Sequence, residues 1–130
     1  MKHLFLGLLL CLLLMAVTCR TKETARLGML QQTWLHSHEE DQGEILTYRP
    51  NTYDFPPSRG RTGFTFNEDG AFIQYEIAPT DGLEERLGTW KLAGRDQIRV
   101  SFAEGAHQDF LLEIVTIEPN LLRVRRRLPE

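Results

Sequence analysis

The stretch from residue 61 to residue 77 reads R-T-G-F-T-F-N-E-D-G-A-F-I-Q-Y-E-I, and it decides the fold class. Two runs rich in aromatic and β-branched residues flank the tetrapeptide at 67–70, where an Asp-Gly pair supplies the positive φ that a tight hairpin turn needs. Phe64 and Phe66 lie two residues apart, so they share one face of the first strand. The stretch predicts a β-hairpin.

Eight extended segments follow residue 32. They are residues 33–39, 44–49, 61–67, 71–78, 85–92, 97–103, 109–117 and 121–128. The alternation is clearest in the sixth, where Ile98, Val100 and Phe102 face one way and polar residues the other. No helical pattern interrupts the series, and closure of such a series removes unpaired strand edges. We therefore predict an all-β domain over residues 33–130, a small antiparallel up-and-down barrel of about eight strands, with an open sandwich as the alternative.

The connections between these segments form two sets. The tight ones are residues 40–43, 67–70, 93–96 and 118–120, and the longer ones are residues 50–60, 79–84 and 104–108. Because consecutive strands of an up-and-down barrel alternate in direction, we expect the two sets at opposite ends. Trp34, early in the first segment, is then expected at the end that carries the long loops.

Large aromatic side chains dominate the energetics of a core, and five of them are candidates for the core or lumen of the barrel. These are Trp34, Phe64, Phe66, Trp90 and Phe102. Strands this short leave a narrow interior, which such rings can fill entirely. The interior therefore either holds a small ligand or is solid.

The first residues differ in character from the rest of the chain. Lys2 precedes an apolar run at residues 4–15, which is short for a membrane span and typical of the central region of a signal peptide. We expect residues 1–18 to be a signal peptide, with an uncleaved anchor helix as the alternative. Residues 19–32 then form a tether or a short helix that begins the exported protein.

Residues 16–19, A-V-T-C, resemble a bacterial lipobox, in which the cysteine is lipidated and becomes the first residue. The lipobox pattern prefers Leu where Ala16 stands and Gly or Ala where Thr18 stands. Removal of the signal leaves Cys19 as the only cysteine, so it has no partner for an intramolecular disulfide. We expect lipidation of Cys19 and a place in the cell envelope. Ordinary cleavage near residues 16–18 or near Ala25, giving a secreted or periplasmic protein, is the alternative.

The formal net charge of −3 argues against nucleic acid as a partner, which would require a basic stripe. The one basic cluster, at residues 123–127, alternates with an apolar residue and is typical of a strand face. No nucleophile with a neighbouring base and no phosphate-binding loop is visible, so we expect no enzymatic activity and no cofactor. His36 and His38 lie beside acidic residues but lack a third ligand at motif spacing, so we expect no metal site.

The segment from residue 50 to residue 61, P-N-T-Y-D-F-P-P-S-R-G-R, is the loop with the strongest binding character. Loops carry binding residues more often than the strands that they connect. Tyr53 and Phe55 offer rings, and Arg59 and Arg61 can hold an acid. We predict that these four residues form either a ligand-binding rim or a packed lid.

Several motifs follow in a characteristic order: F-T-F-N-E-D-G-A-F at 64–72, G-T-W-K-L at 88–92, I-R-V-S-F at 98–102, and the strands at 110–117 and 122–124. This succession resembles the lipocalin-like domain of small exported bacterial proteins, over about half of the chain. The first strand of that family usually carries G-x-W, and here Trp34 lacks the preceding glycine. The resemblance implies a small calycin-type barrel, often a lipoprotein, without catalytic residues.

Two functions are consistent with these features. The first is an exported lipocalin-like barrel that binds a small apolar or amphipathic ligand in its lumen or at its loop rim. The second is an envelope interaction or structural lipoprotein with a solid core, which acts through the loop at 50–60. In both, the only contact with a membrane is an N-terminal lipid.

Overall fold

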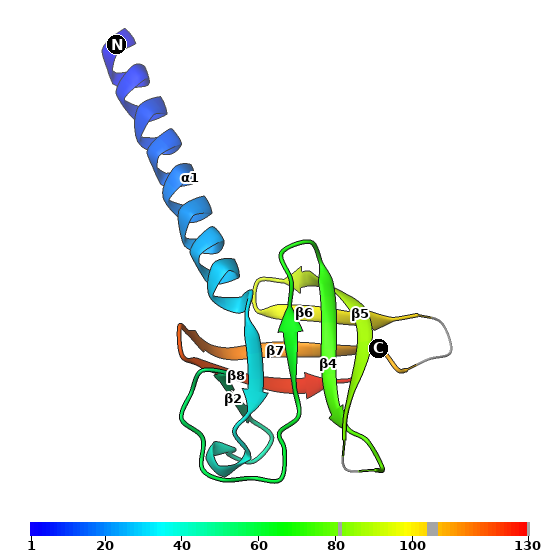
Figure 1. Cartoon of the computed structure of the whole chain (residues 1–130). Helices are drawn as coiled ribbons and strands as arrows, with labels where there is room; N and C mark the ends of the chain where they lie inside the picture. Colours follow the sequence, from blue (N-terminus) through cyan, green and yellow to red (C-terminus); the bar gives the residue numbers. More distant parts are fainter. Residues whose placement is uncertain (81, 104–106, 130) are drawn as a thin grey trace. The chain divides into compact units, whose positions relative to one another are not determined.

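The computed structural model describes residues 1–80, 82–103 and 107–129, without the side chains of residues 16–19. The chain divides into two compact units, Met1–Leu30 and Gln31–Glu130. The first unit is a single helix, and the second is an all-β domain (Figure 1).

Helix α1 spans Lys2–Leu30 without a break. By length and composition it can cross a membrane, and its place near the N-terminus is also that of a signal sequence. The helix therefore fits the predicted signal segment. The expected boundary between signal and tether falls within it, and the side chain of Cys19, the predicted lipidation site, lies outside the described residues.

The described part of the second unit forms a closed antiparallel barrel of eight strands, so the predicted all-β barrel is confirmed. The strands are β1 Thr33–His36, β2 Leu46–Pro50, β3 Gly63–Phe66, β4 Ala71–Ile77, β5 Leu83–Gly94, β6 Gln97–Phe102, β7 Phe110–Glu118 and β8 Leu121–Arg127. A short 3-10 helix, η1 His38–Glu40, follows β1. The hairpin predicted from residues 61–77 is β3 and β4, and Gly70 in its turn has a φ of +90°.

The order of strands around the barrel follows the chain except at β1. This strand lies between β2 and β3, and β2 closes the barrel by pairing with β8. Both neighbours run antiparallel to β1, so β2 and β3 run parallel to each other. Residues 51–62, which join them, therefore pass from one end of the barrel to the other. We call these residues the crossover connection.

Strand directions correct two expectations about the barrel ends. The hairpin turns after β3, β5 and β7 lie at one end, here called the tight-turn end, and the connections after β1, β4 and β6 lie at the other, here called the long-loop end. The prediction that residues 40–43 share an end with the other tight turns is wrong. The prediction that Trp34 lies among the long loops is also wrong, because β1 starts at the tight-turn end. Both errors come from the position of β1 between β2 and β3.

The barrel interior is packed with aromatic rings. Phe64, Phe66 and Phe72 contact one another, with ring centroids 5.0 to 5.8 Å apart. Trp34 is fully buried beside them in the middle of β1. The half-buried Trp90 packs against Phe66, and its indole N–H donates to the carbonyl of Asn67.

Phe102 is half-buried and packs edge-on against Phe72 at 6.1 Å. Together with the buried aliphatic residues of β6, β7 and β8, these rings pack the barrel interior, and Phe66, Phe72 and Trp90 lie nearest the tight-turn end. All five aromatic residues named from the sequence are therefore buried or half-buried and belong to the packing of the barrel interior.

Candidate binding site at the long-loop end

Residues that pair directly across antiparallel strands share a face of the sheet, which identifies the residues that face the lumen. Phe66 pairs with Phe72, and Phe64 pairs with Gln74. Along β4, the inward-facing side chain therefore changes from the aromatic Phe72 to the polar Gln74 towards the long-loop end. The same change occurs where Leu112 pairs with Arg126.

A cavity of about 70 Å³ occupies this region. Its lining comes from β2, the start of β3, β4, β7 and β8, and consists of Tyr48, Thr62, Gly63, Phe64, Gln74, Tyr75, Glu76, Phe110, Leu112 and Arg126. A water molecule occupies roughly 30 Å³ in the liquid. The cavity therefore has room for a small polar group and a methyl or two, and not for a lipid tail.

Tyr48 is the buried hydroxyl of the site. Its ring packs between His36, at 5.2 Å, and Phe64, at 4.5 Å. Burial raises the pKa of the Tyr48 phenol well above its usual range, and the charge of Arg126 opposes that shift only in part. The hydroxyl is therefore protonated at all physiological pH values and can both donate and accept a hydrogen bond.

Two further polar side chains come from β4. Gln74 is buried, and its amide donates a hydrogen bond to the carboxylate of Glu76. This bond orients the amide and leaves its oxygen as an acceptor. Glu76 is half-buried nearer the end of the strand, so it is the carboxylate of the cavity.

Arg126 supplies the positive charge of the cavity from β8. Its guanidinium carbon lies 4.0 Å from the ring centroid of Phe110, a cation–π contact that holds the head group over the apolar wall. The side chain is largely exposed, so its N–H groups can reach a ligand that enters from solvent. The site thus combines one cation, one carboxylate, a hydroxyl and an amide over a wall of Phe64, Phe110 and Leu112.

No family model, curated protein or solved structure matches the chain.

Two arginines anchor the crossover connection and the segment after β1. Arg61 donates two hydrogen bonds to the carboxylate of Glu39, at 2.9 and 2.6 Å, and also reaches the carbonyls of His36 and Pro56. Its side chain is only 7% exposed. The Arg61 hydrogen bonds lower the pKa of Glu39 to about 2.

Arg49 makes the equivalent pair with Glu40, at 2.9 and 2.7 Å, and donates a third bond to the carbonyl of Asn120. The hydroxyl of Ser37 also donates to Glu40. The Arg49 hydrogen bonds lower the pKa of Glu40 to about 2. Both pairs have the planar, two-bond geometry that is the strongest form of carboxylate recognition.

The four residues predicted as a rim or lid lie on the crossover connection, and the cavity is lined by other residues of the described chain. The rings of Tyr53 and Phe55 contact each other at 4.9 Å. Arg49 lies over Tyr53 and Arg61 over Phe55, at 4.9 and 4.5 Å. Arg59 is exposed. In this structure Arg61 is bound to an acid of its own chain, Glu39, which leaves Arg126 as the arginine of the cavity.

The histidines considered as metal ligands have different partners. His36 Nε2 lies 2.8 Å from Asp41 Oδ2, and His38 lies 3.6 Å from Glu39. Asp41 also accepts a hydrogen bond from the backbone N–H of Thr47. Among the described residues, no group of three or more His, Cys, Asp or Glu side chains is placed to hold a metal ion.

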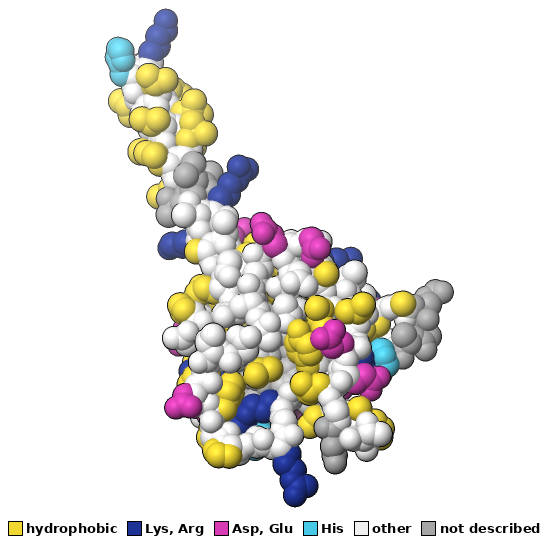
Figure 2. All heavy atoms as spheres, in the orientation of Figure 1, with side chains coloured by type: hydrophobic (Ala, Val, Ile, Leu, Met, Phe, Trp, Pro, Cys, Tyr) yellow, Lys and Arg dark blue, Asp and Glu magenta, His cyan; other side chains and the backbone are white. Residues whose placement is uncertain are grey.

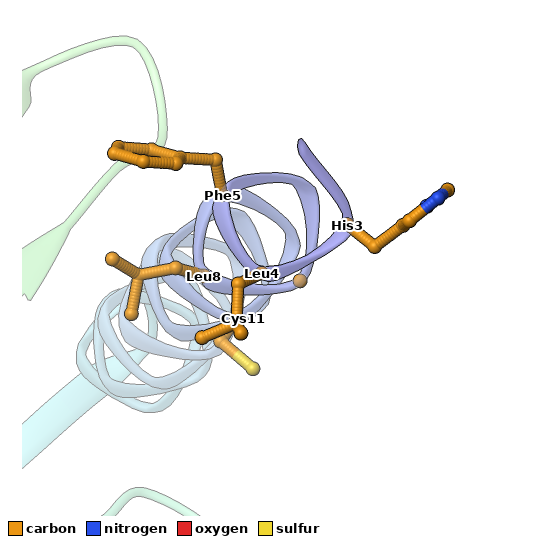
Figure 3. A pocket seen from close by; sticks show the side chains of 6 residues that line it. His3, Leu4, Phe5, Leu8 and Cys11 are labelled. Atoms are coloured by element: carbon orange, nitrogen blue, oxygen red, sulfur yellow. The ribbon is translucent and has the colours of Figure 1, made fainter. Parts of the chain in front are cut away.

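A second hollow lies on the surface of α1, lined by His3, Leu4, Phe5, Gly7, Leu8 and Cys11. Figure 3 shows Leu4, Leu8 and Cys11 along one side of the helix, with Phe5 and His3 pointing away from it in other directions. These side chains lie three or four residues apart, which is the spacing of one helical face. The hollow is the surface between exposed side chains of a bare apolar helix, and it offers no convergent polar groups.

Proposed function

We propose that this chain is an exported β-barrel that binds a small amphipathic carboxylate at its long-loop end. The observation that carries the proposal is the cavity of about 70 Å³, in which Arg126, Tyr48 and Gln74 converge over a wall of phenylalanine and leucine. A concave site with a few placed polar groups beside apolar walls is the usual form of a small-molecule site, and in this cavity the polar groups dominate the exposed lining.

The size of the cavity sets the size of the ligand. Sites for drug-sized molecules enclose roughly 300–1,000 Å³, which is several times the volume available here. Only a short group enters the barrel, so a longer ligand would leave its remainder outside. The filled interior towards the tight-turn end supports this limit, because Phe66 and Phe72 occupy the space that a lipid tail would need.

The polar groups define the chemistry of the ligand. Arg126 is the partner for a carboxylate, and the Tyr48 hydroxyl can donate a second hydrogen bond to the same group. Glu76 accepts hydrogen bonds, so it favours a ligand that also carries a hydroxyl or an amine. The ligand class is therefore a short hydroxy or amino acid with a small apolar part that packs against Phe64 and Phe110.

The proposed location rests on the N-terminal helix, which fits a signal sequence. We propose that residues 1–18 are removed on export and that a lipid on Cys19 holds the barrel to a membrane. The proposed role is binding without catalysis. The mildly acidic charge of the chain supports a ligand other than nucleic acid.

The test is titration calorimetry of the protein purified from its exporting cell, against a series of short hydroxy and amino acids. Arg126→Gln should weaken binding about 10- to 100-fold, because a hydrogen bond to a charged group contributes about 1.5–3 kcal/mol. Arg127→Gln is the matched control, since Arg127 lies one residue away and pairs with Glu113 at 2.9 Å.

Equal affinity of Arg126→Gln and wild type would exclude Arg126 from the site. The binding role would be refuted if no compound in the series gave a heat of binding and none shifted the NMR signals of the cavity residues. The solid-core envelope protein would then be the better description, because it requires no ligand in the lumen.

A further inference from the structure

Strand β5 has a free edge over its first five residues. Its twelve residues pair with β4 from Leu83 to Thr89 but with β6 only from Gly88 to Gly94. In the described part of the chain, residues 83–87 therefore have a neighbouring strand on one side alone. Figure 1 shows this half of β5 extending with β4 away from β6. An unpaired strand edge is a template for another strand.

The backbone groups that point away from β4 can be identified from two hydrogen bonds. Trp90 N–H donates to the carbonyl of Gly70, and the carbonyl of Gly82 accepts from Ala78 N–H, so even-numbered residues of this stretch point towards β4. The register is continuous between them. Alternation then directs the N–H and C=O groups of Leu83, Glu85 and Leu87 towards the free edge.

The sequence of this edge, L-E-E-R-L, is complementary to itself in the antiparallel direction. Two copies aligned about Glu85 place Leu83 of each against Leu87 of the other. The same alignment places Glu84 of each against Arg86 of the other. These charge pairs occupy the non-hydrogen-bonded sites, where facing side chains come closest.

We propose that residues 83–87 form a homodimer interface in which the β5 edges of two copies pair as antiparallel strands. The outward backbone groups of Leu83, Glu85 and Leu87 match those of the second copy at this register, which gives three hydrogen-bonded residue pairs. The register also gives two Leu–Leu contacts and two Glu–Arg contacts. A single opposed pair of like charges remains, Glu85 against Glu85.

The exposed side chains around the edge agree with this partner. Leu83 and Leu87 are 66% and 71% exposed, and Ile77, opposite Leu83 on β4, is 47% exposed. Figure 2 shows hydrophobic side chains gathered on the face that carries β4. Exposed apolar patches of this kind mark interaction sites, and pairing of two β5 edges extends the same face across both copies.

Arg86 supplies a second, independent observation. Its Nε is buried and has no hydrogen-bond partner within the described chain. A buried N–H without a partner is unusual in a native structure. In the dimer, the carboxylate of Glu84 from the second copy lies across from Arg86 and supplies the missing acceptor.

The experiment measures self-association of the full chain in detergent micelles by sedimentation equilibrium. Glu84→Arg and Arg86→Glu should each weaken association tenfold or more, because each places like charges opposite one another. A 1:1 mixture of the two variants should restore it, since one copy then carries arginine and the other glutamate at both paired positions. Glu68→Arg, an exposed change in the turn after β3, is the matched charge control and should behave as wild type.

Disulfide cross-linking tests the proposed register of the two β5 strands. Hydrogen-bonded pairs in antiparallel sheets have Cα atoms about 5.5 Å apart, within the range that a disulfide spans. Glu85→Cys should therefore cross-link to itself on oxidation above the wild-type baseline set by Cys11 and Cys19, whereas Leu87→Cys, which faces Leu83, should not. The proposal would be overturned if the mixed charge variants associated as weakly as either variant alone. Equal cross-linking at positions 85 and 87 would also overturn it.

Discussion

Replacement of Gly63 by alanine tests the strand order of the barrel directly. A Cβ at this position would lie 2.2 Å from the carbonyl oxygen of Trp34 and 3.0 Å from the Cα of Leu35, both of them backbone atoms of β1. Ordinary van der Waals contact begins near 3.4 Å, so β1 and β3 must separate by about 1 Å or more. No rotation of a side chain can relieve this contact.

The cost follows from what that separation breaks. The hydrogen bond from His36 N–H to the Thr62 carbonyl, 2.8 Å in the native barrel, would lengthen beyond hydrogen-bonding range. Overpacking of a core typically costs about 1–3 kcal/mol. We expect the upper end of that range for Gly63→Ala, because the backbone itself must move. For a domain of this size, about 3 kcal/mol lowers Tm by about 12 °C or more.

The assay is thermal and urea unfolding followed by tryptophan fluorescence, since Trp34 is buried next to the altered contact. Gly82→Ala is the matched control, because a Cβ there meets nothing within 4 Å. If Gly63→Ala unfolded at the wild-type midpoint, β3 could not be packed against β1. The strand order and the crossover connection would then both be wrong.

Two further outcomes are expected. The folded pKa of Glu39 and Glu40 is about 2, below the ordinary 4.5, so their pairs contribute stability that is present above about pH 4.5 and is lost as pH falls towards 2. Thermal unfolding between pH 6 and 2.5 should show this loss. Both carboxylates are about one-third exposed, so added salt should reduce it. Arg49→Gln should make the loss of stability with falling pH less steep, and an unchanged loss would exclude the Arg49–Glu40 pair as a cause. Separately, Cys19→Ala should release the protein from the membrane fraction and block signal processing of the lipoprotein type, as read by fractionation and intact mass. Normal processing with retained membrane association would refute lipidation.

The elements that sequence predicts well here are those that depend on neighbours in the chain. The turn at 67–70 needs only an Asp-Gly pair, and Ile98, Val100 and Phe102 identify β6 by alternation alone. The eight strands and the closed barrel follow from such local patterns. The order of the strands around the barrel does not follow from local patterns. Strand β1 is only four residues long, and nothing in its sequence indicates that β2 pairs with β8 and not with β3.

Sequence reasoning misses the cavity for a related reason. Gln74 and Glu76 continue the inward alternation that begins at Phe72, so strand periodicity is the signal that could have found them. Tyr48 and Arg126 cannot be added from the sequence, because their approach depends on the pairing of β2 with β8. The loop at 50–61 gives the stronger local signal, because its rings and arginines lie close together in the chain.

That loop has a different physical role, which connects the stability of the barrel to its site. The crossover connection must run the length of β1 without strand partners of its own, so it needs other anchors. Arg61 provides one, because its buried guanidinium binds Glu39, His36 and Pro56 at once. Thr62 and Gly63, the next residues in the chain, line the cavity. Loss of the Arg61–Glu39 pair should therefore loosen the wall of the binding site before it unfolds the barrel.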